Sequence, residues 1–377
     1  MISILDEHKY TIYNEIDIIF THSISFIHRR HTMIDLRSDT LTIPDRSMLE
    51  TILTAPLGDD GRLDAEGRGE DPTVNKLEDM SAALVGKQAG LLCTSGTMGN
   101  QAAVLTWCRP GDTVLVNDLQ HLDRSEKTAF DPRFGQMKKA VYHLDENFQP
   151  ATEEIEDQFR TGSIKLLCLE NTHNYTGGTC ITEASLKKIY DLAQKYYIPV
   201  HMDGARLFNA ALYLKVPVSQ LCQYVDSVQF CFSKGLGAPV GSVLCGSKEF
   251  IKAAKETRKL MGGAMRQAGI IAAPAIYALE HNIPRLQEDH DNCATCAAQL
   301  QNLKKVIVQK DVQTNILMLD VAQTGITPQE FCARAKAKGL WIRPIINTSV
   351  RLVFYKGITR QDALNAAAII RELDAEL

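Results

Sequence analysis

The sequence predicts an α/β protein with a mainly parallel sheet, helices on both faces of that sheet, and a small α+β domain at the C-terminal end. Short apolar, β-branched segments alternate with helical segments through most of the chain, as in parallel sheets. Two of these segments, one ending at Asp203 and one running into Lys234, lie about one crossover helix apart. The 377 residues, with 45% hydrophobic content, can also bury a large core and allow two domains.

The first 32 residues differ from the rest, being rich in isoleucine and histidine. The apolar run 18–20 is too short to span a bilayer. Acidic residues and the lack of a small-residue cleavage site argue against a targeting peptide. We expect 1–32 to be an N-terminal extension, either upstream of a true start at Met33 or a family-specific N-terminal arm.

The large domain is expected over 33–285, with its elements in simple succession. A helix from about residue 47 precedes a charged loop, and a helix over 73–85 leads to an apolar strand over 89–93. Further strands are predicted near 112–117, 139–144, 164–170, 198–203, 227–233 and 241–245. Helices such as 183–197 separate them, and helices around 248–260 and 267–305 lead the chain out of this domain.

The remaining segment, 286–377, is expected to form the small domain. Its pattern predicts a strand near 312–320, a helix over 327–338, strands near 340 and 350, and a helix over 359–376. Arg351 falls on the last of these strands.

Two polar residues at strand ends indicate amine chemistry. Lys234 follows the apolar run 228–232, and Asp203 closes the strand predicted before it. Open α/β sheets bind ligands at the carboxyl ends of their strands, so the two side chains should meet there. An enzyme that uses pyridoxal 5′-phosphate (PLP) needs this pair, a lysine for the cofactor aldehyde and an acid for the ring nitrogen. Taken singly, each is as well explained as a solvated loop lysine or a capping aspartate.

A phosphate-binding turn is predicted just after the strand over 89–93. The chain breaks there at Ser95, Gly96 and Thr97 and enters a helix beginning near Met98. Backbone N–H groups at a helix start bind anions, and a nearby hydroxyl assists them. The same tripeptide is also an ordinary helix cap. Its position before the Asp and Lys strands favours the phosphate interpretation.

These residues lie in longer motifs that resemble the low-specificity L-threonine aldolases, in the β-eliminating lyase group of fold-type I PLP enzymes. The resemblance runs from Met33 to Leu377 and implies a fold of the PLP-dependent transferase type. The matching motifs are 34–40, 69–75, 95–100, 169–174, 203–209, 232–241 and 265–267.

The resemblance also implies roles for individual residues. Lys234 would hold the cofactor covalently and Asp203 would pair with its ring nitrogen, while Arg206 would lie against both cofactor and substrate. His121 would stack on the ring and is a candidate base, with stacking alone as the open alternative. The other positions carried over are Glu126 near that histidine, Ser95, Gly96 and Thr97 at the phosphate, Arg266 reaching the phosphate from a second subunit, and Ser38, Arg206 and Arg351 at the substrate carboxylate.

The sequence departs from the family pattern near the site. Residues 62–67 are inserted, and Arg68 stands where the family has an aromatic. Ser125 replaces another aromatic, and 127–134 replaces a glycine-rich stretch. We expect Arg68 to contact the substrate and to favour a polar, anionic or larger side chain than that of threonine. The alternative is that Arg68 points to solvent from a surface loop.

Composition limits the other partners. A formal charge of −4 offers no electrostatic attraction for nucleic acid or for an acidic membrane surface. The ten cysteines suggest a reducing, cytoplasmic setting. The Cys293–Cys296 pair lacks a second ligand pair, so we predict no metal site. The partners expected are a small amino-acid substrate and further copies of the chain, as a homodimer or homotetramer with shared active sites.

The function implied is cleavage of an L-β-hydroxy-α-amino acid, of the threonine or allo-threonine type, to glycine and an aldehyde. Arginine suits the carboxylate-binding role because its planar guanidinium contacts a carboxylate through two hydrogen bonds. Two alternatives stay open on the same scaffold. One is PLP-dependent β-elimination, which needs a leaving group at Cβ, and the other is a PLP-binding protein without turnover.

Overall fold

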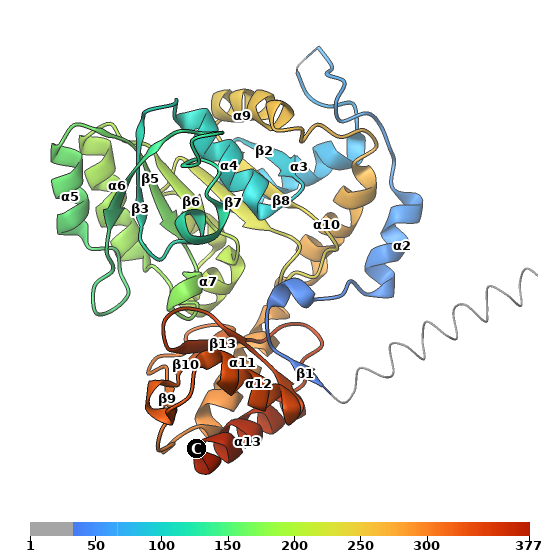
Figure 1. The fold of residues 1–377 in the computed structure, drawn as a ribbon. Coiled ribbons are helices and arrows are strands. Elements are labelled where there is room, and N and C mark those ends of the chain that lie inside the picture. The colour runs from blue at the N-terminus through green and yellow to red at the C-terminus, as the bar shows by residue number, and fades with distance from the viewer. Residues whose placement is uncertain (1–32, 66) are drawn as a thin grey trace, which may run out of the picture.

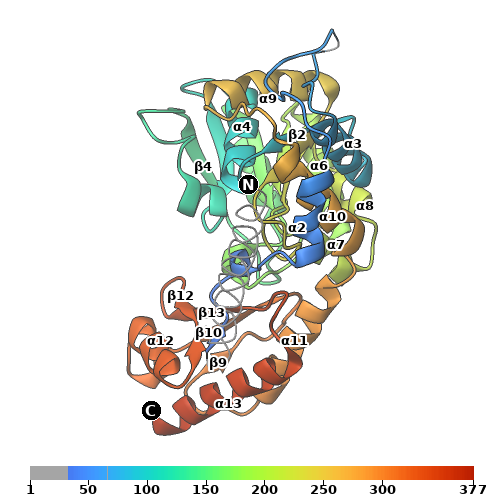
Figure 2. The ribbon, with the colours of Figure 1, turned by 90° about the vertical axis from the view of Figure 1, so that its right-hand side faces the viewer.

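A computed structural model describes residues 33–65 and 67–377 of the chain. The extension expected over 1–32 therefore lies outside the described residues. Figure 1 shows a larger α/β body above a smaller body that contains the C-terminus, and Figure 2 shows the same two bodies from the side.

The larger body is built on a seven-stranded sheet with the order β2-β8-β7-β6-β5-β3-β4. Strands β4, β3, β5, β6 and β7 run parallel, and β8 is antiparallel to both β2 and β7. The predicted mainly parallel sheet is confirmed. The strands are β2 (Ala89–Cys93), β3 (Thr113–Asn117), β4 (Lys138–Tyr142), β5 (Ile164–Glu170), β6 (Val200–Asp203), β7 (Ser227–Cys231) and β8 (Ser242–Gly246).

Both faces of this sheet are covered because alternate residues of each strand point in opposite directions. On β2, Leu91 and Cys93 pack with α4 and α9, whereas Leu92 packs into the main core on the other face. On β5, Leu167 likewise packs into the main core, whereas Leu166 packs into a separate apolar cluster on the other face. The apolar runs read in the sequence are therefore strands buried on both sides, as parallel sheets require.

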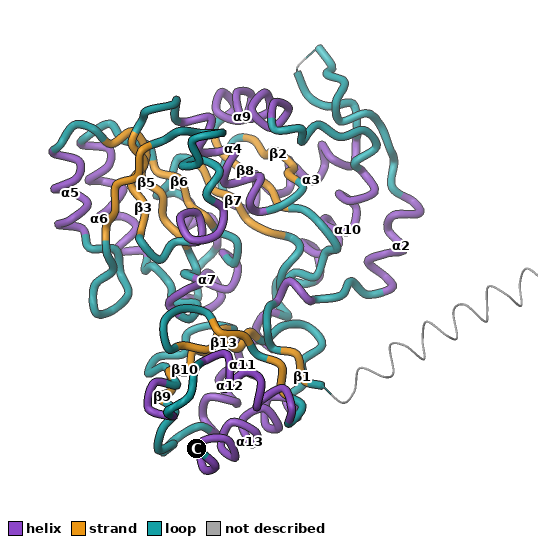
Figure 3. Tube along the Cα trace, in the orientation of Figure 1, coloured by secondary structure: helices purple, strands orange, loops and turns teal. Residues whose placement is uncertain are grey.

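The helices of this body are drawn in purple in Figure 3, and loops and turns in teal connect them to the strands. Asp71 caps α3 by accepting from the N–H groups of Thr73 and Val74, with Pro72 in the first turn. The helices are α2 (Arg46–Thr54), α3 (Pro72–Val85), α4 (Gly96–Trp107), α5 (Thr152–Arg160), α6 (Glu183–Lys195), α7 (Leu207–Leu214), α8 (Val218–Cys222), α9 (Lys248–Leu260) and α10 (Gly269–His281), with short turns η2 (Asp39–Leu41), η3 (Leu122–Glu126) and η4 (Asn174–Thr176).

One helix predicted from the sequence is two helices in the structure. The segment 267–305 divides into α10 and α11 (Leu286–Gln299), with a turn over 282–285 between them. Pro284 explains the break, because proline lacks an N–H and disfavours helical geometry in the residue before it. Within the described part of the chain, no helix is both long and apolar enough to cross a bilayer.

The smaller body confirms the predicted α+β arrangement. Its antiparallel sheet has the order β12-β13-β10-β9, and α11, α12 (Pro328–Ala337) and α13 (Arg360–Glu376) pack against it. Its strands are β9 (Ile307–Val308), β10 (Ile316–Asp320), β12 (Arg343–Pro344) and β13 (Ser349–Val353).

The beginning of the described chain also contributes to the smaller body. Strand β1 (Ile34–Asp35) pairs in parallel with β11 (Leu340–Trp341), and Leu36 is fully buried in the small core. This pairing was not anticipated. The division into 33–285 and 286–377 stays a prediction.

A buried ion pair anchors the edge strand that leads to the phosphate turn. The guanidinium of Arg258, only 1% exposed, donates to the Leu92 carbonyl at 2.6 Å and to Asp60 at 2.7 Å. The N–H of Leu92 donates to the Glu78 carboxylate at 2.9 Å. Burial raises the pKa of Glu78 to about 7. Side chains thus provide hydrogen-bond partners for the backbone N–H and C=O groups of Leu92 at the outer edge of β2.

Replacing Arg258 with leucine should leave Asp60 as a buried carboxylate without its cation. Breaking one partner of a buried pair costs roughly 3–5 kcal/mol of the free energy of unfolding. Urea unfolding at fixed subunit concentration measures the loss. The matched control is Arg46→Leu, whose exposed pair with Glu50 contributes little. Equal losses in the two variants would contradict a structural role for the Arg258 pair.

Candidate active site

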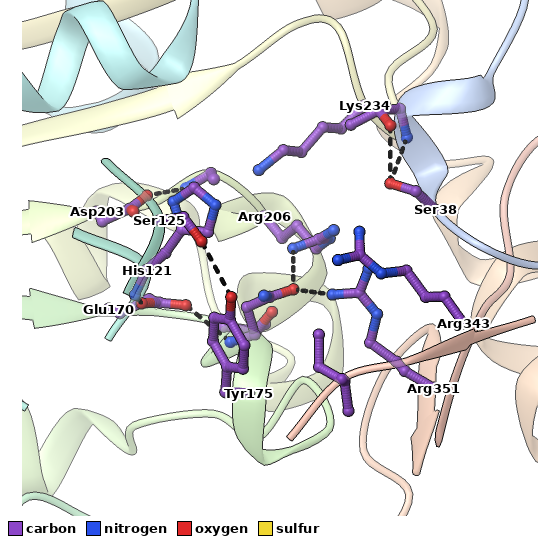
Figure 4. Close-up of a pocket in the computed structure, with 15 residues that line it drawn as sticks. Ser38, His121, Ser125, Glu170, Tyr175, Asp203, Arg206, Lys234, Arg343 and Arg351 are labelled. Atoms are coloured by element: carbon purple, nitrogen blue, oxygen red, sulfur yellow. Dashed lines mark hydrogen bonds between the residues drawn. The ribbon is translucent and has the colours of Figure 1, made fainter. Parts of the chain in front are cut away.

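A cavity of about 200 Å³ opens at the carboxyl ends of β5 and β6, beside β12 and β13 of the smaller body. Figure 4 shows its lining side chains converging from both bodies. They are Ser38, Thr40, His121, Ser125, Glu170, Thr172, Asn174, Tyr175, Asp203, Ala205, Arg206, Lys234, Arg343, Ile345 and Arg351.

Lys234 and Asp203 both line this cavity, as the sequence predicted. Asp203 is the last residue of β6 and pairs in register with Gln229 of the neighbouring β7. Lys234 follows the end of β7, and its side chain extends into the cavity in Figure 4. Parallel strands that end at one edge bring the amine and the carboxylate to the same cavity.

His121 and Glu126 form a hydrogen-bonded pair on the turn η3. Nδ1 of His121 lies 3.1 Å from Oε1 of Glu126, whose side chain is only 2% exposed. Burial disfavours the charged imidazole, but the hydrogen bond to Glu126 and the charges of Asp203 and Glu170 outweigh it, so the pKa of His121 is raised. The imidazolium of His121 therefore keeps its proton to higher pH than an isolated imidazole does.

Asn100 joins this pair to Asp203. Its side-chain nitrogen donates to Glu126 at 3.0 Å and to Asp203 at 2.9 Å, and its oxygen lies 3.2 Å from Nε2 of His201. One ligand atom from each of His121, Glu126 and Asp203 lies within 4.8 Å of the others, close enough to hold a metal ion. The N–H groups of Asn100 point at the two carboxylates where a cation would bind. The absence of metal ligands stays a prediction.

Glu170 ties two loops of the cavity together. Its carboxylate accepts from the backbone N–H of His121 at 2.6 Å and from that of Asn174 at 2.8 Å. Burial and the nearby charge of Asp203 raise the pKa of Glu170 to about 7. One buried carboxyl group thus sets the backbone position of the histidine and of the loop that meets the arginines.

Arg206 and Arg351 meet across the two bodies at Asn174. The side-chain oxygen of Asn174 accepts from Arg206 at 3.2 Å and from Arg351 at 2.6 Å. Arg206 also makes two hydrogen bonds to Asp39, at 2.6 and 2.7 Å. The hydroxyl of Ser38, beside Asp39, lines the same cavity. The three residues predicted at the substrate carboxylate, Ser38, Arg206 and Arg351, all line this cavity.

The two guanidiniums differ in their charge balance. Although burial disfavours its charge, Asp39 keeps the pKa of Arg206 raised. Burial and the positive charge of Arg206 lower the pKa of Arg351 to about 9, so it stays charged at neutral pH. Nε of Arg351 has no hydrogen-bond partner among the described residues.

The predicted phosphate turn begins α4 beside β7. Ser95 caps the helix by accepting from the N–H of Met98 at 3.1 Å, and the side chains of Ser95 and Thr97 are exposed. A Cβ added at Gly96 would lie 2.7 Å from Sγ of Cys231, so only glycine allows the turn to approach β7 so closely. The turn places the start of α4 at the same strand edge as Lys234, and the N–H groups at a helix start are suited to bind an anion.

Residues 35–324 match the sequence profile of the β-eliminating lyase family. A low-specificity L-threonine aldolase from Escherichia coli is 38% identical over 345 residues, covering 89% of this chain and 98% of that protein. Low-specificity L-threonine aldolase 1 from Arabidopsis thaliana is also 38% identical, covering 87% of this chain and 93% of the relative.

The chain belongs to the low-specificity L-threonine aldolases of the β-eliminating lyase family. A solved structure of Leishmania major threonine aldolase shares the fold, with a TM-score of 0.74 at 15% identity over 90% of this chain and 99% of that one. The resemblance read from the motifs is confirmed.

Aldolases of this family work with PLP, and the residues present fit that cofactor. An amine, a carboxylate for the ring nitrogen and a glycine-based anion turn all meet at one strand edge. Oγ1 of Thr172, on the cavity wall, is buried without a hydrogen-bond partner in the described structure. A cavity with such an unsatisfied hydroxyl is suited to a polar ligand.

Two predicted site residues, Arg266 and Arg68, form contacts away from this cavity, and Ser95, Gly96, Thr97 and Glu126 are not among its lining residues either. The side chain of Arg266 is 70% exposed and pairs with Asp59 at 3.1 Å. Arg68 donates to Asp79 at 3.1 Å and to the Asn75 carbonyl at 3.2 Å, and it lines a separate groove between the charged loop, α3 and α9. Within one subunit, neither residue meets Lys234.

The cavity and network residues that were assigned no role from the sequence include Asn100, Glu170, Asn174 and Arg343. Asn100, Glu170 and Asn174 fall within aldolase motifs that were recognised. The sequence alone did not show which side chains they contact, so it gave no basis for assigning their roles. Arg343 lies outside those motifs, and its place depends on the pairing of β12 with β13.

Replacing Glu126 with glutamine should lower the pKa of His121. The variant removes the carboxylate that stabilises the imidazolium, so the ring should lose its proton at lower pH than in the wild type. NMR titration of histidine-labelled protein measures the shift, with the exposed His143 as an internal reference. A pKa of His121 that stays the same or rises would show that Glu126 does not set it.

Proposed function

We propose that this chain cleaves the Cα–Cβ bond of an L-β-hydroxy-α-amino acid, of the threonine or allo-threonine type, giving glycine and an aldehyde. One observation carries the proposal. The same cavity holds a strand-end amine, a carboxylate beside an imidazole, and two guanidiniums that share one amide oxygen. As a member of this aldolase family, the protein is a carbon–carbon lyase that depends on PLP.

The arginines orient the substrate. We expect Arg351 and Arg206, with Ser38, to bind the α-carboxylate, because a guanidinium contacts a carboxylate bidentately. Arg206 is held by Asp39 and Arg351 by Asn174, so neither has to be ordered when substrate binds. Fixing the carboxylate leaves the Cα–Cβ bond free to take the reactive orientation.

His121 moves the proton. In the retro-aldol step, a base takes the β-hydroxyl proton as the aldehyde forms and the Cα–Cβ bond breaks. The neutral His121, held by Glu126, is suited to accept that proton directly or through water. When bound, PLP supplies an electron sink for the electron pair left at Cα. Lys234 would hold the cofactor, and Asp203, itself held by Asn100, would keep the ring nitrogen protonated.

Replacing Lys234 with alanine should reduce turnover by at least roughly a thousandfold and remove the Schiff-base absorbance band, because no amine then holds the cofactor. Lys195→Ala, on the exposed face of α6, is the matched control. Circular dichroism checks that both variants are folded. A spectrum unchanged in the Lys234 variant would refute the assignment.

Products distinguish the related reactions. With threonine, the proposed reaction gives glycine and acetaldehyde, whereas β-elimination gives ammonia and 2-oxobutyrate. A protein that binds PLP without turnover would give neither. Glycine from threonine in the wild type, lost in Lys234→Ala, supports the aldolase reaction.

We further propose that the protein acts as a homo-oligomer in the cytoplasm, with active sites shared between subunits. Arg266, expected at the phosphate, lies outside its own cavity with an exposed side chain, as it would if it served a second subunit. The ten cysteines are all free and buried, which suits a reducing compartment.

Sedimentation velocity should therefore show a dimer or tetramer. Arg266→Ala should weaken PLP binding, measured by the cofactor concentration needed for half-saturation, because the phosphate loses a cation. The control is Arg334→Ala, whose exposed pair lies within α12. A monomer with full activity, or unchanged cofactor affinity in Arg266→Ala, would refute shared sites.

A further inference from the structure

Arg343 places an additional cation in the substrate cavity. It is the first residue of β12, lines the cavity, and faces Arg351 as its register partner on β13. Figure 4 shows the two guanidiniums side by side at the cavity edge. Like charges directly opposite on paired strands are destabilising. Arg343 is exposed to solvent, and an anion bound between or beside the two guanidiniums would relieve their repulsion.

The protein does not supply that anion. Among the described residues, the salt bridge at this cluster joins Arg206 to Asp39, and neither Arg351 nor Arg343 has an ion pair. The acidic residues of the cavity wall are engaged elsewhere, Glu170 by two backbone N–H groups and Asp203 by Asn100 and the N–H of Ala205. Arg351 and Arg343 therefore carry positive charges that no carboxylate of the described residues pairs with.

A threonine-like substrate neutralises one of them. Its single carboxylate would bind at Arg351 and Arg206, leaving Arg343 exposed to the side chain of the substrate. The facing wall is polar as well, since the hydroxyls of Ser125 and Tyr175 lie 3.0 Å apart at the cavity. Ser125 stands where an aromatic was expected from the family pattern. The arrangement is suited to a charged rather than an apolar substituent.

We propose that the cavity is specialised for β-hydroxy-α-amino acids that carry a second carboxylate on the side chain, bound by Arg343. This inference rests on the proposed retro-aldol function and names its substrate class. It assigns to Arg343 the preference for an anionic side chain that the sequence suggested for Arg68.

The reaction balances without any further reactant. With 3-hydroxyaspartate, the Cα–Cβ bond breaks, the β-hydroxyl loses its proton and becomes the aldehyde of glyoxylate, and Cα gains a proton to give glycine. No oxidant or reductant is consumed. Arg343 takes no part in the proton transfers and acts as a specificity-determining residue.

The test compares 3-hydroxyaspartate and threonine in wild-type holoenzyme, Arg343→Gln and Arg343→Lys. We expect kcat/KM for 3-hydroxyaspartate to exceed that for threonine in the wild type and to fall by roughly 10- to 100-fold in Arg343→Gln, the loss typical of one charge-assisted contact. The value for threonine should change by less than about threefold. Arg343→Lys should retain part of the preference, because it keeps the charge without the fork. Arg360→Gln, exposed at the start of α13, is the control for loss of one positive charge.

Binding supplies a second readout that does not depend on turnover. L-aspartate carries the second carboxylate but no β-hydroxyl, so it should bind the wild type more tightly than L-alanine and lose that advantage in Arg343→Gln. Calorimetry measures both dissociation constants. Thermal melting checks folding, and removing the repulsion from Arg351 should leave the melting temperature unchanged or higher.

The outcomes separate this inference from the proposed function. If the wild type cleaves neither amino acid, the aldolase proposal fails. If it cleaves threonine but does not prefer 3-hydroxyaspartate, or if Arg343→Gln affects both substrates equally, the role of Arg343 is overturned. Unchanged aspartate binding in that variant would overturn it as well.

Discussion

The buried ion pair between Arg206 and Asp39 is the interaction on which the site depends. Asp39 lies in the turn after β1, and Arg206 lies between β6 and α7, so the pair joins the start of the described chain to the large sheet. Through Asn174, the same guanidinium is linked to Arg351 of the smaller body. Breaking such a pair would leave a buried charge, at a cost of roughly 3–5 kcal/mol. Three distant segments are thereby fixed around one cavity.

A second network governs protons at the other end of the cavity. Asn100 donates to both Glu126 and Asp203, so two carboxylates can lie close together without direct contact. His121 faces one of them, and Glu170 holds its backbone. An amide and backbone N–H groups therefore lie between carboxylates whose charges would otherwise repel.

Much of this arrangement was readable from the sequence because it depends on periodicity and chain order. Lys234 and Asp203 were predicted together since both end apolar runs one crossover apart, and the glycine at position 96 marked the turn beside them. The single long helix over 267–305 was wrong because apolar periodicity continues across Pro284. Asn174 and Arg343 escaped notice because their roles depend on contacts across the two bodies. The strand register that sets Arg343 opposite Arg351 leaves no signal in the order of residues.

The pairing of β1 with β11 ties the completion of the site to the completion of the chain. Residues 34–35 cannot pair with 340–341 until roughly 300 further residues have been synthesised. At a typical rate of about 5–20 residues per second, that interval lasts roughly 15–60 seconds. Ser38 and Asp39 come shortly after β1, so the pairing of β1 with β11 joins this part of the cavity to the C-terminal strands. A chain that ends before β13 would lack Arg351, and with it part of the carboxylate-binding corner of the cavity, even after the large sheet has formed.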